Sequence, residues 1–93
     1  MPSVLDRIKG LNAQIAVIES QIDQSTAEVS MLEHINDDAQ RDAAVTERYE
    51  DIADANMTDG DVKRIRSHIR AMEKDRSKLV AKRDRLVRKL AAG

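Results

Sequence analysis

The sequence lacks cysteine, tryptophan and phenylalanine, and Tyr49 is its only aromatic residue. Without cysteine, neither a disulfide nor a thiolate nucleophile can form. Large aromatic side chains normally supply much of a globular core, so their absence from a chain of 93 residues disfavours a compact globule. Pro2 is the only proline, and interior glycine is confined to Gly10 and Gly60. Since helix-breaking residues are so rare, we expect helix along nearly the whole chain.

Long apolar runs are also missing. The N-terminal stretch has an acid at Asp6 and no apolar segment long enough for a signal peptide. No segment approaches the roughly 18 apolar residues that a membrane-spanning helix requires. The sequence therefore predicts a cytoplasmic protein, or one in a particle that assembles in the cytoplasm.

Charged residues are abundant, at 35% of the chain, and they are unevenly distributed. Residues 1–60 hold four bases and thirteen acids, a net charge of −9, whereas residues 61–93 hold twelve bases and four acids, a net charge of +8. A high charge content with few aromatic residues is typical of long helices and coiled coils. Opposite charge on the two parts of one chain indicates self-pairing or a charged partner.

The first segment shows the alternating four- and three-residue spacing of a coiled coil. Its apolar positions are Val4, Ile8, Leu11, Ile15, Ile18, Ile22, Val29 and Leu32. Branched residues at heptad position a, followed by Asn36 at the same position, favour a parallel dimer. The polar Ser25 at position d leaves antiparallel pairing and larger oligomers open. The same apolar face could instead pack on its own chain in a helical hairpin, and both arrangements coexist in a four-helix dimer.

The middle of the chain is expected to break the helix twice. Asn36-Asp37-Asp38 resembles a loop, and the acidic segment around Gly60 resembles a turn because glycine tolerates backbone angles that other residues avoid. We therefore predict one domain over 1–93, with helices at about 3–36, 39–56 and 60–91 and a turn at 57–60. A continuous helix over 3–56 is the alternative. Ser3 with Asp6, and Thr58 with Asp61, resemble capping boxes at two of these helix starts.

The last segment repeats the coiled-coil spacing. Its apolar positions are Ile65, Ile69, Met72, Leu79, Leu86 and Leu90. Arg76 and Arg83 interrupt this stripe, and a buried arginine needs an acidic partner. Acids of the first segment could provide that partner, namely Glu19, Asp23, Glu28 or Glu33. The fold class is thus all-α, a long helical hairpin or three-helix antiparallel arrangement with coiled-coil seams, assembling into a dimeric bundle.

No residue constellation in the sequence indicates catalysis, a metal or a cofactor. His34 and His68 lie in different predicted helices, and neither follows a glutamate at the spacing of helical di-metal sites. The chain also lacks the clustered glycines of a phosphate-binding loop. We therefore predict a protein that is not an enzyme and that binds no cofactor.

The last segment also carries a basic face, formed by Arg64, Arg70, Lys74, Lys78, Arg85 and Arg88. Such a face can dock an acidic protein surface or the phosphate backbone of a nucleic acid, whereas membrane binding is disfavoured without Trp or Phe anchors. Part of this charge could also pair within the assembly. The sequence predicts a homo-oligomeric assembly or adaptor protein, such as a scaffolding, phage or secretion assembly factor or a small regulator. The alternative is a regulator that binds nucleic acid.

Overall fold

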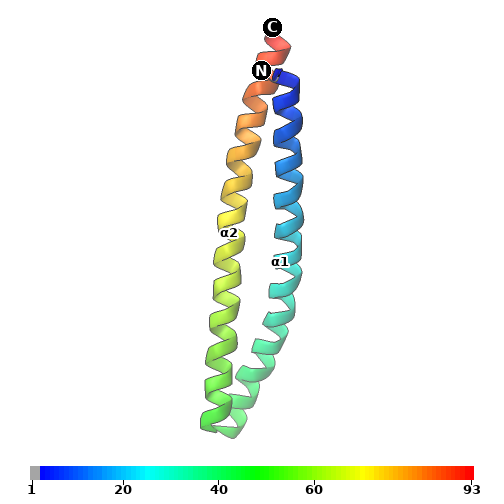
Figure 1. Cartoon of the computed structure of the whole chain (residues 1–93). Coiled ribbons are helices and arrows are strands. Elements are labelled where there is room, and N and C mark those ends of the chain that lie inside the picture. Colours follow the sequence, from blue (N-terminus) through cyan, green and yellow to red (C-terminus); the bar gives the residue numbers. More distant parts are fainter. Residues whose placement is uncertain (1–2) are drawn as a thin grey trace. The chain divides into compact units, whose positions relative to one another are not determined.

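The computed structural model describes residues 3–93, and over this range the chain forms two helices and no strand. Helix α1 spans Val4–Thr46 and helix α2 spans Tyr49–Ala92, with residues 47–48 between them (Figure 1). The predicted all-α fold with two long helices is therefore confirmed. The predicted three-helix arrangement is wrong, because the acidic middle segment is divided between α1 and α2 and forms no helix of its own.

Helix α1 begins at the predicted capping box. The backbone N–H of Asp6 donates to Ser3 Oγ over 3.1 Å, and the backbone N–H of Ser3 lies 3.4 Å from Asp6 Oδ2. This reciprocal arrangement satisfies amides that have no partner inside the helix. The carboxylate of Asp6 in the first turn also complements the positive end of the helix dipole.

The helix breaks predicted at residues 36–38 and 57–60 are both absent, since these residues lie within α1 and α2. The predicted capping box of Thr58 and Asp61 is absent for the same reason. Thr58 Oγ1 instead lies 3.1 Å from the carbonyl oxygens of Asp54 and Ala55 in the preceding turn of α2. A helix tolerates an interior threonine whose hydroxyl has a hydrogen-bond partner, and the nearest acceptor of the Thr58 hydroxyl is Asn36 Oδ1 at 2.9 Å. An isolated glycine costs only about 1 kcal/mol.

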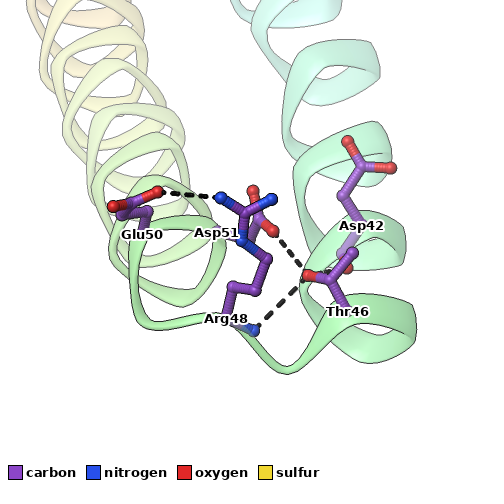
Figure 2. A network of polar contacts seen from close by, with 5 residues as sticks. All are labelled: Asp42, Thr46, Arg48, Glu50 and Asp51. Atoms are coloured by element: carbon purple, nitrogen blue, oxygen red, sulfur yellow. Dashed lines mark hydrogen bonds and ion pairs between the residues drawn. The ribbon is translucent and has the colours of Figure 1, made fainter.

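The observed turn uses Glu47, which adopts a positive φ of 54°. Thr46 organises this turn, because its hydroxyl lies within hydrogen-bond distance of the Asp42 carbonyl and the Asp51 carboxylate and also accepts from the backbone N–H of Arg48 (Figure 2). The Arg48 side chain reaches Glu50. Two acids in the first turn of α2 favour its start at this position.

The helices divide into two compact units, each containing a part of α1 and a part of α2. The terminal unit comprises Met1–Asp23 and Ala71–Gly93. Its core contains Ile8, Leu11 and Leu86, with Val4 and Leu79 packed against them. The first residues of α1 thus lie beside the last residues of α2, so the two segments of this unit are antiparallel (Figure 1).

The turn unit comprises Gln24–Arg70 and is a helical hairpin. Its helices are also antiparallel, since Glu33 pairs with Arg66 while Gln40 Nε2 donates to the carbonyl oxygen of Ala55 over 3.2 Å. Ala55 is only 2% exposed. Such complete burial of a small side chain indicates close packing of the helices near the turn.

Candidate interaction surfaces

The predicted oligomer seam is largely covered by the chain itself. Its buried members are Ile8, Leu11, Ile15, Ile22, Val29, Met72 and Leu86, and its half-buried members are Val4, Ile18, Leu32, Ile65, Ile69 and Leu79. Leu90 alone is exposed, at 49%. Because these faces pack within a single chain, only the half-buried members of the seam and Leu90 stay partly open to another molecule.

The arginines that interrupt the seam of α2 do not find the partners predicted for them. Arg83 Nη1 donates to Asn12 Oδ1 over 3.2 Å, and its Nε donates to Asp84. Arg76 is half-buried, and over residues 3–93 it has no carboxylate within ion-pair distance. Glu33, one of the acids proposed for this role, binds Arg66 instead. Partial exposure of both arginines allows their charged ends to reach water.

The six residues of the predicted basic face fall into both units. Arg64 and Arg70 belong to the turn unit, and Arg64 pairs with Asp61 one helical turn earlier. Four belong to the terminal unit, are exposed, and have no ion pair with any described carboxylate: Lys74, Lys78, Arg85 and Arg88. We call these four residues the basic strip. At 3.6 residues per turn they fall within about 80° of the circumference of α2.

The two units carry opposite net charge. The terminal unit holds ten bases and six acids, a net charge of +4, and the turn unit holds six bases and eleven acids, a net charge of −5. Ion pairs in the turn unit are mainly local, as in Lys63 with Asp59 and Arg41 with Asp38. Local ion pairs therefore leave an excess of acids in the turn unit and an excess of bases in the terminal unit.

Open grooves along the helices of residues 3–93 include two in each unit, which the sequence patterns did not predict. We number the heptads so that the seam residues occupy positions a and d, with Ile8 of α1 and Ile69 of α2 at position a. The groove residues that do not belong to the seam positions then occupy positions c and g, with Ala13 the exception. In an antiparallel pair, residues at position g of both helices flank the same side of the seam. Within each unit the two grooves therefore lie on the same side of the helix pair, and we call this the groove side of that unit. The signal in the sequence was Val17 and Met31, apolar residues at position c that the seam did not use.

The two histidines lie on different helices, His34 on α1 and His68 on α2. His68 lines a groove of the turn unit beside Glu28 and Asp61, and His34 is exposed on α1. Within residues 3–93 no group of three or more histidine, aspartate or glutamate side chains is arranged to hold a metal ion. Neither helix contains, over the same residues, an apolar segment long enough to cross a lipid bilayer.

Comparison with known proteins identified no relative of this chain. No protein-family profile matches the chain, and no similar protein was found among curated sequences or solved structures.

Proposed function

We propose that this protein is a non-enzymatic helical assembly or adaptor protein that self-associates and docks an acidic protein partner on its basic strip. The observation that carries the docking proposal is the state of Lys74, Lys78, Arg85 and Arg88. All four are exposed, share one face of α2, and have no carboxylate of the described chain as a partner.

Helix stabilisation alone accounts poorly for the basic strip. A base near a helix C-terminus interacts favourably with the helix dipole, but this effect is confined to the last turn. Of the basic residues of α2, only Lys89 lies in the last turn. Lys74 and Lys78 lie several turns earlier, where clustered like charges repel one another. A partner that brings carboxylates to this face would relieve the repulsion and form charge-assisted hydrogen bonds.

The chemistry around the strip favours an acidic protein surface over single-stranded nucleic acid. No aromatic residue lies in residues 61–93, so bases have no ring to stack on. Ala81 lies on the same face of α2, between Lys78 and Arg85. Its small side chain leaves the long basic side chains room to converge on a partner.

The test compares two variants with the same loss of charge. One replaces the four strip residues with glutamine, and the control replaces four exposed bases elsewhere: Lys9, Arg41, Arg48 and Lys63. Binding to labelled poly-L-glutamate, as an acidic polypeptide probe, is measured by fluorescence anisotropy at several salt concentrations. We expect the strip variant to bind at least tenfold more weakly than wild type and the control to stay within about twofold.

Equal losses in both variants would show that only net charge matters and would overturn the strip as a docking site. A duplex DNA probe provides the second arm of the experiment. The protein could bind DNA more tightly than the polypeptide, with an affinity that falls log-linearly as salt rises. That result would identify a nucleic acid, and not an acidic protein, as the partner.

A further inference from the structure

The single chain leaves more surface exposed than is usual for its mass. Its accessible surface is 6876 Å², whereas a folded monomer of 10.4 kDa exposes roughly 5,400 Å². The excess of roughly 1,500 Å² is larger than the roughly 800 Å² that each partner contributes to a standard interface. The area that a stable dimer requires is therefore available.

The groove side of the terminal unit combines an apolar floor with basic margins. One groove is lined by Val17, Ile18 and Leu79, with little polar surface. Val17 is 59% exposed although it is a branched apolar residue. The other groove is bordered by Arg7 and Lys82, and Lys89 continues position g of α2 one heptad further. Asp75 is the only acid at position g in this unit.

The groove side of the turn unit has a similar apolar floor with acidic margins. One of its grooves includes Ile35 and Met57, flanked by Asp42 and Asp54. The other includes Leu32 and Ile65, flanked by acids of both helices, Glu28 and Asp61. Two further residues of α2, Arg64 and His68, line the same groove, and Arg64 pairs with Asp61. All four of these acids occupy position g, and Met31 is a further exposed apolar residue at position c, at 66%.

We propose that the groove side of the terminal unit of one copy docks on the groove side of the turn unit of a second copy. The apolar floors of the grooves, together with the exposed Met31, would then be buried, and bases at position g would face acids at position g. The reciprocal contact between the other two units would make the assembly a two-fold symmetric dimer. This inference rests on the self-association in the proposed function and names its surface and its antiparallel sense.

A second copy fits better than an unrelated protein because the two surfaces complement each other in charge and in heptad position. Charges at positions flanking an apolar seam set partner choice and orientation in helical assemblies. A parallel dimer would place like charges together, Arg7 and Lys82 against the same bases of the other copy. Like charges in contact across an interface are unfavourable and act against that pairing.

A charge exchange tests the antiparallel contact. One variant changes Arg7, Lys82 and Lys89 to glutamate, and the other changes Glu28, Asp42 and Asp54 to lysine. None of these residues belongs to the basic strip, although Lys78 and Arg85 of the strip occupy position c of α2 and so lie on the groove side. By sedimentation velocity at physiological salt, we expect wild type to be dimeric and each variant alone to be monomeric. An equimolar mixture should be dimeric again, because both contacts of the mixed dimer regain opposite charge.

A second pair of variants tests the apolar floor without charge exchange. Val17→Asp places a carboxylate on the groove side, and Ala16→Asp places one on an exposed residue at position b. We expect Val17→Asp to weaken the dimer at least tenfold and Ala16→Asp to change it less than threefold, with unchanged helix content in both.

The outcomes separate this inference from the proposed function. If the wild-type chain stays monomeric at 100 times the protein concentration of the sedimentation experiments, self-association is refuted and this interface with it. A wild-type dimer that tolerates Val17→Asp and both charge variants would leave self-association standing but overturn the groove side as its surface. Zero-length cross-linking of the wild-type dimer adds an independent check, since lysines of the terminal unit should join acids of the turn unit.

Discussion

Gly60 lies inside α2, which begins at Tyr49 and ends at Ala92. No glycine of the described chain has a positive φ, and a Cβ atom added at Gly60 would meet nothing within 4 Å. Alanine would therefore fit without strain and reduce the backbone entropy lost on folding. We expect Gly60→Ala to raise the free energy of unfolding by about 0.5–1 kcal/mol.

Unfolding by heat and by urea, followed by circular dichroism, measures this change. For a chain of this size, a gain of 1 kcal/mol corresponds to a rise in Tm of about 4–8 °C, and the urea m-value should be unchanged. Gly10→Ala in α1 is the matched reference, since its added Cβ also meets nothing. Both variants are compared at one protein concentration because self-association would shift Tm. A loss of stability in Gly60→Ala, beside a gain in Gly10→Ala, would refute the continuous α2 and restore a turn at this glycine.

Three further predictions concern the turn, the core and the polar part of the seam. Glu47→Gly should stabilise the fold by about 1 kcal/mol in the same unfolding assay, because its φ of 54° is unfavourable for a residue with a Cβ atom. Ile15→Ala should cost about 2–5 kcal/mol, whereas Val17→Ala should cost less than about 0.5 kcal/mol in the monomer, since Ile15 is 5% exposed and Val17 is 59% exposed. Thr58→Val should cost about 1 kcal/mol by removing the hydrogen bond to Asn36, and exchange of amide hydrogens should accelerate near that position.

The seam could be predicted from the sequence because its residues are apolar and follow the coiled-coil spacing. Ile8, Leu11 and Ile15 are all buried, as the period of the pattern requires. The spacing also continues beyond Leu32, through Ala39 and Ala43, which are half-buried. Small or polar side chains at these positions carry little hydrophobic signal. The large apolar residues of the seam therefore end at Leu32, although α1 continues to Thr46.

The turn could not be located from local residue preferences. Asp59-Gly60 has the composition of a turn but lies in α2, while the actual turn places Glu47 at a positive φ without glycine. Packing between the two helices overrides these weak local preferences. The basic strip was predictable from charge spacing, but its lack of ion partners was not, because that depends on where the acids of α1 lie.

Asn36 indicates whether the seam of α1 packs against the same chain or against another chain. In a parallel dimer, an asparagine at position a pairs with the same residue of the other chain. Here Asn36 Oδ1 accepts from the Thr58 hydroxyl over 2.9 Å and lies 3.4 Å from Gln40 Nε2. Both partners belong to the same chain, so this polar layer fixes the register of α1 against α2 within the turn unit. An intermolecular seam at Asn36 would have to break these bonds in a half-buried site, which costs about 1–3 kcal/mol for each unsatisfied group. The proposed association through the groove sides would leave this layer intact and would avoid that cost.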